Sequence, residues 1–331
     1  MTEPELATKA PESDASAPPA SASEQAPPAP TLSEHCTSDR PTPAGQSSTG
    51  EITKLADIDV YISKPADYPH TPSKLLLLLT GGTGLHSVNN QIQADRFASE
   101  GYLVVMPDLF NGDAAPNAST LADEPTTPGS FLDTFKIKAA ETAKSFLIDM
   151  WLARHTEEKV MPILTKVIEA CKDEFADAVS HGGGIYAVGY CFGGRYVLLL
   201  AGARPTVTGR GFPWSAMSTP APDEEAGKKA STEGPFIKAG AIAHATLVSR
   251  ADFEGLKAPV SLVSVENDPL FPDEVRTAGE DYMRENGVEH EVQVYPGVPH
   301  GFAVVGEYED TNIKSAQVTA YEQMLKWIQE H

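Results

Sequence analysis

Residues 189–194 have the sequence GYCFGG, and this stretch constrains the fold more than any other part of the chain. An apolar run over residues 185–188 precedes it, and a helix-like run over residues 195–201 follows it. A strand, a tight turn and a helix in this order form a nucleophile elbow, in which glycines let the backbone double back and lift the central side chain above the sheet. That side chain is Cys191, where serine is usual.

Cys191 has two interpretations at this position. The unpaired N–H groups and the dipole at the start of the following helix favour a thiolate, which is the reactive form of a cysteine. The alternative is a glycine-rich turn that holds a small buried cysteine, because cysteine is among the most frequently buried residue types.

The chain from residue 55 onward alternates between strand-like and helix-like segments. Strands are predicted at 57–62, 74–79, 102–106, 185–188, 239–243, 260–265 and 291–295, and helices at about 90–100, 273–285 and 313–329. Strands separated by helices predict an α/β fold with a doubly wound, mostly parallel sheet and helices on both faces.

The predicted α/β domain spans residues 51–331. Residues 1–50 are rich in Pro, Ala, Ser, Thr and Glu, and a segment of this composition predicts a disordered acidic tail, with Cys36 where the tail starts to pack on the domain. A helical insertion is predicted at about 114–180, with helices near 132–154 and 157–178 that can wall the pocket. Residues 205–236 are predicted to form a long surface loop.

Composition excludes several classes of function. A formal charge of −21 argues against nucleic acid and against anionic membranes as partners. The start of the chain lacks the basic and apolar regions of a signal peptide, so three cysteines fit a cytoplasmic location better than a disulfide framework. None of the cysteines has CxxC or Cys/His spacing, so no metal site is expected.

A cysteine nucleophile needs a base to take its proton and a third group to orient that base. Asp268 follows the predicted strand 260–265, and His300 follows the predicted strand 291–295. The order Cys191, Asp268, His300 is that of α/β-hydrolases, and the carboxyl ends of parallel strands meet at one edge of the sheet. Separately, each has a plainer explanation, since Asp before Pro forms turns and a loop histidine can satisfy backbone groups.

Backbone N–H groups are expected to form the oxyanion hole. One is the amide of Phe192, directly after the candidate nucleophile, and the other is expected from Gly82, in the turn over residues 81–84. A phosphate-binding loop is the alternative for this turn, but the Lys-Ser/Thr pair that a Walker A motif requires does not follow it.

The chain from about residue 55 to 330 resembles the dienelactone hydrolase family of α/β-hydrolases, and most of all its fungal-type branch. The segments that carry the resemblance are ADRFA at 94–98, MPDLF at 106–110, residues 189–194, the Asp268 loop and YPGVPHGF at 295–302. The resemblance implies hydrolysis of an ester or lactone without a cofactor. Cys191 would form an acyl-cysteine, His300 would shuttle the proton, and Asp268 would orient His300.

Three positions depart from the bacterial members of that family. Their activating glutamate is matched here by Gly81, and their substrate-binding arginines by Asn111 and Val304. A substrate that carries a carboxylate is therefore doubtful, because burying its charge without a cationic partner is costly.

Two functions from different classes remain open. The first is a cytoplasmic esterase or lactonase that cleaves an ester, lactone or thioester of a small organic acid. The second is a non-hydrolytic binding or redox-sensing protein on the same fold, which the missing glutamate and a reactive thiol would suit. The sequence does not determine the substrate or the oligomeric state.

Overall fold

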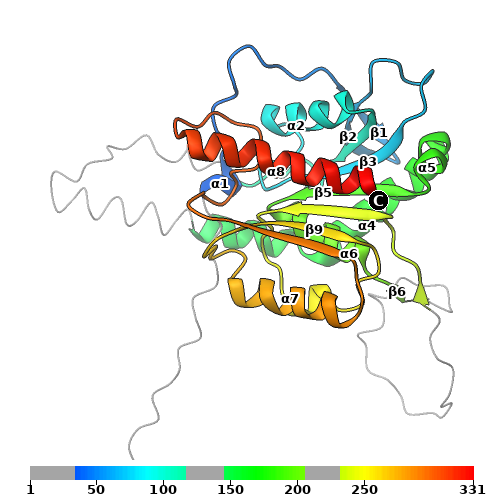
Figure 1. The fold of residues 1–331 in the computed structure, drawn as a ribbon. Coiled ribbons are helices and arrows are strands. Elements are labelled where there is room, and N and C mark those ends of the chain that lie inside the picture. The colour runs from blue at the N-terminus through cyan, green and yellow to red at the C-terminus, as the bar shows by residue number, and fades with distance from the viewer. Residues whose placement is uncertain (1–33, 117–144, 206–231) are drawn as a thin grey trace, which may run out of the picture.

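An eight-stranded sheet forms the centre of the molecule in the computed structural model, which describes residues 34–116, 145–205 and 232–331. The strand order is β1-β2-β4-β3-β5-β8-β9-β10 (Figure 1). The strands from β4 to β10 run parallel to their neighbours, whereas β1 and β2 are antiparallel at one edge. This is the mostly parallel α/β-hydrolase sheet that the sequence predicts.

The predicted strands and helices of the sheet are found close to their expected bounds. The strands are β1 (Glu51–Leu55), β2 (Ile58–Ser63), β3 (Lys74–Leu79), β4 (Tyr102–Pro107), β5 (Ile185–Tyr190), β8 (Ala239–Ala243), β9 (Val260–Val265) and β10 (His290–Tyr295), and β6 (Arg204–Pro205) pairs with β7 (Thr232–Glu233) apart from them. The helices are α1 (Glu34–Thr37), α2 (Val88–Ser99), α4 (Glu157–Glu174), α5 (Ala176–Gly182), α6 (Phe192–Ala201), α7 (Asp273–Glu285) and α8 (Thr311–Glu330), with a helical stretch at 145–154 and a 3₁₀ turn at Arg250–Phe253.

The run of leucines in β3 is explained by burial on both faces. Leu75, Leu77 and Leu79 belong to one hydrophobic cluster, and Leu76 and Leu78 belong to the other. Successive side chains of a strand point to opposite faces, so a strand covered on both sides is apolar throughout. By contrast, β1 was not predicted, because its side chains are exposed apart from Leu55 and it has no such apolar run.

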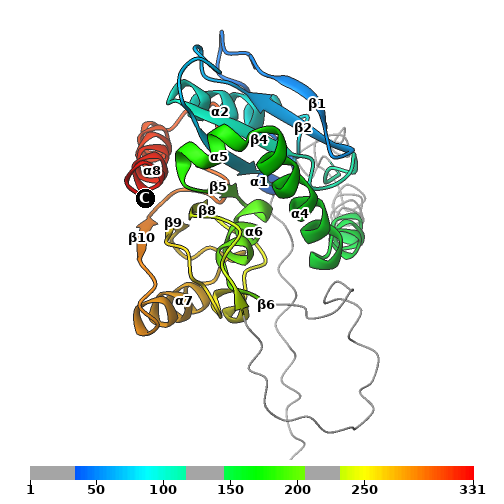
Figure 2. The ribbon, with the colours of Figure 1, turned by 90° about the vertical axis from the view of Figure 1, so that its right-hand side faces the viewer.

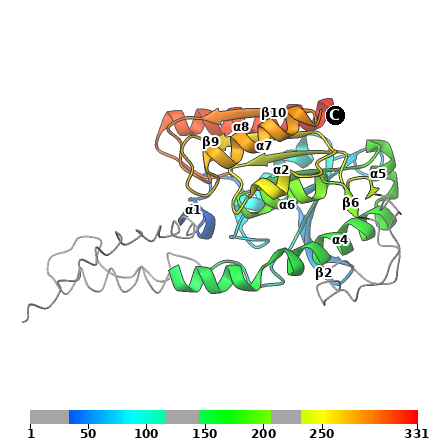
Figure 3. The same ribbon diagram turned by 90° about the horizontal axis from the view of Figure 1, so that it is seen from below.

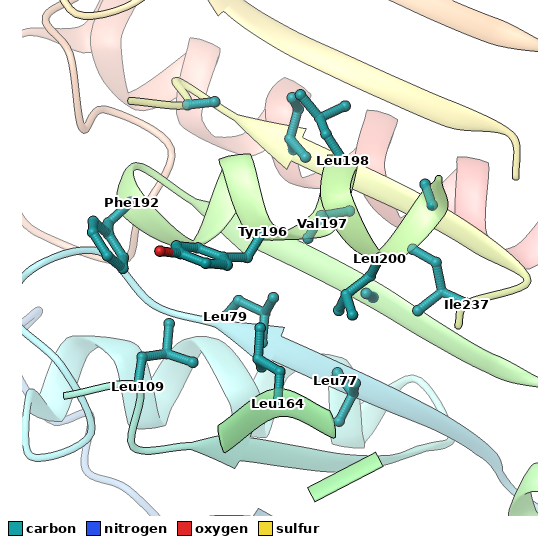
Figure 4. Close-up of a cluster of buried hydrophobic side chains, with 14 of the residues drawn as sticks. Leu77, Leu79, Leu109, Leu164, Phe192, Tyr196, Val197, Leu198, Leu200 and Ile237 are labelled. Carbon is teal, nitrogen blue, oxygen red and sulfur yellow. The ribbon is translucent and has the colours of Figure 1, made fainter. Parts of the chain in front are cut away.

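Helices cover both faces of the sheet. α2 and α8 pack on one face, and α4, α6 and α7 lie on the other (Figures 2 and 3). On the face covered by α4, α6 and α7, side chains of α6 such as Val197 and Leu200 belong to one hydrophobic cluster with side chains of β3 and α4. Figure 4 shows Leu77, Leu79 and Leu164 among them. α6 is therefore held firmly, and its first residue follows Cys191 directly.

The strand order places a topological switch between β3 and β5. From β3 the chain continues to β4 on one side, and it then returns through β5, β8, β9 and β10 on the other side. Ligands of open α/β sheets bind beyond the carboxyl ends of the strands at such a point. The turn at 80–84 follows β3 and Cys191 follows β5, so both lie at this position.

Several sequence predictions fall outside the described residues. These are residues 1–33 of the tail, the part of the insertion at 117–144, and the loop at 206–231. Within the described residues, the chain packs on the domain well before residue 50, because Cys36 and Thr37 are buried. The helix expected at 157–178 is divided into α4 and α5, which meet at Phe175.

Candidate active site

Cys191 is held in a strained turn between β5 and α6. Its backbone has φ 50° and ψ −116°, a conformation that residues other than glycine rarely adopt. Its N–H donates to the Ala243 carbonyl at 3.1 Å, and its own carbonyl accepts from the Thr246 N–H at 3.0 Å. A Cβ at residue 193 would lie 2.3 Å from the Leu79 carbonyl oxygen, so the elbow requires glycine there. The elbow thus lets the start of α6 sit directly against β3.

Asp268 and His300 form a buried pair. Asp268 follows β9 and His300 follows β10, and His300 Nδ1 lies 2.6 Å from Asp268 Oδ2. The other carboxylate oxygen accepts the Leu270 N–H at 3.0 Å, which fixes the carboxylate. The structure therefore places these two predicted residues in the relation that an orienting acid and a base require.

Thr246 connects the histidine to the sulfur. Its Oγ1 lies 3.2 Å from His300 Nε2 and 3.3 Å from Cys191 Sγ, and Thr246 is fully buried. The sulfur and a ring nitrogen of His300 are themselves within 4.8 Å of one another. Sequence reasoning missed Thr246, because a threonine three residues beyond a strand carries no recognisable catalytic pattern.

The electrostatics of the pair and of the thiol differ. Burial opposes the charge on His300, but the hydrogen bond that its ring donates to Asp268 and the nearby Cys36 outweigh burial and raise the pKa of His300 to about 9. Burial, followed by Cys36, raises the pKa of the Cys191 thiol well above its ordinary value, against the opposing effects of Thr246 and the Phe192 N–H. Burial and Cys36 outweigh Thr246 and the Phe192 N–H at the helix start, so the direction of the shift favours the thiol over the thiolate that the helix start was expected to favour.

Cys36 is a second sulfur at the site. Its Sγ lies 3.1 Å from Cys191 Sγ, although the residues are 155 positions apart. Its segment is anchored nearby: Asn89 Nδ2 donates to the Arg40 carbonyl at 2.7 Å, and the Glu307 N–H donates to the Pro41 carbonyl at 2.8 Å. The sequence placed Cys36 where the tail meets the domain, but nothing in it gave the distance to the elbow.

The Phe192 N–H and the turn that holds Gly82 both lie close to Cys191. The Phe192 N–H points to Cys191 Sγ and lowers the pKa of that thiol. The turn after β3 also approaches this residue, because a Cβ at Gly81 would lie 3.1 Å from Cys191 Cβ. A Cβ at Gly82 would lie 2.5 Å from the Cys36 carbonyl oxygen, so α1 packs closely on this turn.

Two cavities adjoin these groups. The smaller, of about 30 Å³, is lined by Cys36, Cys191, Gly81, Asn90, His244 and Val304 among others. The larger, of about 440 Å³, is lined by Phe192 and Thr246 together with Leu152, His155, Thr156, Glu157, Glu158, Arg195, Tyr196 and Leu247. The larger cavity reaches Phe192, which follows Cys191, and Thr246, whose hydroxyl lies 3.3 Å from the sulfur. It is wide enough for a small organic molecule.

The larger cavity has no uncompensated cation among its described lining residues. The Arg195 guanidinium contacts Asp252 at 2.9 Å and Glu157 at 2.7 Å. Arg154 is paired with Asp113 at 2.9 Å. Val304, which matches one arginine position of the bacterial enzymes, lines the smaller cavity.

The insertion contributes a wall to the site. Trp151 is fully buried against Phe110 and Phe192, at ring distances of 4.9 and 5.5 Å. Phe146 is instead 62% exposed. Trp151 therefore packs the helical stretch at 145–154 onto the elbow, whereas Phe146 takes no part in that packing.

One group of possible metal ligands occurs among the described residues. Cys36, Cys191 and His300 offer two sulfur atoms and one ring nitrogen, all within 4.8 Å of one another. Thiolate and imidazole are zinc ligands, but a structural zinc site has four ligands. Two of the three, Cys191 and His300, are also candidate catalytic groups.

Comparison with known proteins supplies the wider context. The model of the dienelactone hydrolase family matches residues 58–331. The chain is 30% identical over 282 residues to hydrolase tropI of Talaromyces stipitatus, covering 85% of this chain and 90% of that protein. It is 28% identical to dienlactone hydrolase 1 of Gibberella moniliformis, over 85% and 87% of the two chains.

Solved structures support the fold. A thermophilic esterase from Thermogutta terrifontis superposes with a TM-score of 0.53 at 16% identity, covering 86% of this chain and 96% of that chain.

Within the part of the chain that the structure describes, no helix combines the length and the apolar character needed to cross a membrane.

Proposed function

The chain belongs to the dienelactone hydrolase family, and on that premise we propose that it hydrolyses an ester, lactone or thioester of a small organic acid through Cys191, His300 and Asp268. The observation that carries the proposal is the continuous contact from the Asp268 carboxylate through His300 and Thr246 to the sulfur at the elbow. Such a chain of contacts gives a nucleophile a base and gives the base an orienting group.

The first half of the reaction forms an acyl-cysteine. Neutral His300 accepts a proton from the Thr246 hydroxyl at Nε2, while Thr246 takes the proton of the Cys191 thiol. The sulfur attacks the carbonyl carbon, and the N–H groups of Phe192 and Gly82 bind the oxygen that becomes negative. When the intermediate collapses, the imidazolium protonates the departing alcohol or thiol.

The second half releases the acid. Neutral His300 removes a proton from a water molecule as that water attacks the acyl-cysteine carbonyl. When the intermediate collapses, the imidazolium returns this proton to the departing sulfur, which frees Cys191 as a thiol. The small cavity beside Cys191 supports this step, since about 30 Å³ exceeds the roughly 10–15 Å³ that one water needs. Asp268 keeps the ring of His300 in place through its contact with Nδ1.

We further propose that the acyl group is uncharged and occupies the larger cavity. Leu152, Leu247 and Tyr196 offer apolar surface there, whereas Glu157 and Glu158 would repel a carboxylate. The charge of Arg195 is already balanced by its two acidic partners. A desolvated carboxylate without a cation would cost several kcal/mol, so neutral esters and lactones fit better than acidic ones.

The test is a panel of short p-nitrophenyl esters and neutral aryl lactones, with carboxylate-bearing analogues beside them. We expect turnover of the neutral compounds, abolished by Cys191→Ala and retained by Cys171→Ala, since Cys171 is a buried residue of α4. Full turnover by Cys191→Ala would refute the proposed nucleophile. A reactive Cys191 thiol with no turnover of the panel would favour the redox-sensing alternative.

A further inference from the structure

The two sulfur atoms at the site are close enough to react with one another. We propose that Cys36 and Cys191 form a reversible disulfide, which makes the pair an oxidation site and removes the candidate nucleophile from the reaction. The atoms lie 3.1 Å apart, and the two residues are 1% and 3% exposed. A disulfide has an S–S length of about 2.05 Å, so the sulfurs must approach by about 1 Å.

The surrounding structure holds Cys36 against the elbow from several sides. Gly82 has no side chain, and any Cβ there would collide with the Cys36 carbonyl oxygen at 2.5 Å. Beyond α1, the Arg40 guanidinium lies over the ring of Tyr308 at 4.9 Å, and Thr42 Oγ1 donates to Asn89 Oδ1 at 2.9 Å. These contacts therefore hold Cys36 in a fixed position beside Cys191.

The groups around the pair support reaction at sulfur. A ring nitrogen of His300 lies within 4.8 Å of both sulfurs, and Asp268 stabilises the imidazolium form of that ring. A cation beside two thiols favours loss of a proton from one of them. Cys171 differs in this respect, since it lies in α4 and is not part of this group.

The oxidant is a peroxide, and the chemistry balances in two steps. The deprotonated sulfur of the pair attacks one peroxide oxygen, the O–O bond breaks, and a sulfenic acid and one water are formed once a proton is taken up. The second sulfur then attacks the sulfenic sulfur, its proton leaves with the hydroxide as a second water, and the S–S bond forms. Two thiols are oxidised by two electrons, and one peroxide is reduced to two waters.

The disulfide has two consequences. Cys191 can no longer attack a carbonyl, and it is protected from irreversible oxidation to a sulfinic or sulfonic acid. A dithiol restores it by thiol–disulfide exchange. The effect on hydrolysis rests on the proposed function, whereas the bond itself rests only on the geometry of the two cysteines.

The experiment treats the reduced full-length protein with hydrogen peroxide and measures three quantities. We expect the three thiols of the chain to fall to one, and non-reducing peptide mapping to show a Cys36–Cys191 linked peptide. We expect turnover of a p-nitrophenyl ester to drop by more than about tenfold and to return with dithiothreitol, because the bonded sulfur has no nucleophilic thiolate.

Two variants distinguish disulfide formation between Cys36 and Cys191 from other oxidation of the protein. In Cys36→Ser, peroxide should oxidise Cys191 further, to the sulfinic acid. The turnover that this variant loses, measured against its own untreated rate, should therefore not return with dithiothreitol. Cys171→Ala should oxidise and recover as the unchanged protein does. Absence of the linked peptide, or full recovery of oxidised Cys36→Ser, would overturn the proposal. A linked peptide in a protein that hydrolyses nothing would uphold the disulfide and refute only the proposed function.

Discussion

The Asp268–His300 pair predicts a specific dependence of stability on pH. The pKa of His300 is about 9 in the folded protein against an ordinary 6.5. At about 1.4 kcal/mol for each pKa unit, this difference corresponds to about 3 kcal/mol. Because the folded pKa is the raised one, this stabilisation is fully present below pH 6.5 and is lost as the pH rises through about 9.

The substitution Asp268→Asn should remove most of this contribution. An amide retains the shape of the carboxylate but not its charge, so burial then keeps His300 neutral. We expect the variant to lose the most stability near pH 6, and the difference from the unchanged protein to shrink by up to about 3 kcal/mol towards pH 10. The measurement is the free energy of unfolding by urea at several pH values across this range.

Asp252→Asn is the matched control. It also breaks a buried ion pair, but its partner Arg195 stays charged throughout, so its loss of stability should not vary with pH. A constant difference for Asp268→Asn, parallel to that of Asp252→Asn, would refute the assignment of the raised pKa to the contact with Asp268.

Three further predictions concern the elbow and the transfer of the proton. Gly193→Ala should cost more than about 3 kcal/mol of unfolding free energy, because its Cβ meets the Leu79 carbonyl oxygen at 2.3 Å, whereas Gly234→Ala, with nothing within 4 Å, should cost under about 1 kcal/mol. Thr246→Val should lower kcat by about 10²-fold or more in steady-state assays with little change in KM, since it removes the hydroxyl between sulfur and ring; unchanged kcat would exclude the relay. The kcat/KM for a neutral ester should rise with pH to about 9, because His300 must be neutral to accept a proton; a rate that is flat from pH 6 to 9 would contradict that role.

Local sequence patterns predicted the parts of the fold that depend on burial. β3, whose five leucines divide between two hydrophobic clusters, and β5, followed by the glycines of the elbow, could be located from composition and spacing alone. β1 could not, because an exposed edge strand of mixed polarity has no distinctive period. The places of Asp268 and His300 after two successive strands, in the order Cys191, Asp268, His300, predicted them as a pair, and the resemblance to a known family implied the same roles.

Contacts that single side chains make across the site could not be predicted from sequence patterns. Cys36 precedes the region that resembles the family, and its position beside Cys191 depends on how α1 packs on the turn at 80–84. Thr246 acts through two hydrogen bonds of its hydroxyl, which no spacing rule encodes. The raised pKa of Cys191 likewise follows from complete burial, which the helix-start argument did not include.

The anchoring of residues 36–42 beside the elbow affects how this protein should be trimmed for experiments. The family match starts at residue 58, and an expression boundary chosen there would appear to keep the entire catalytic unit. It would in fact remove the Cys36 sulfur that lines the small cavity, together with the Arg40 guanidinium that lies over the ring of Tyr308. A shortened protein of this kind would present Cys191 to solvent, and rates or inhibitor profiles measured on it would describe a different cavity.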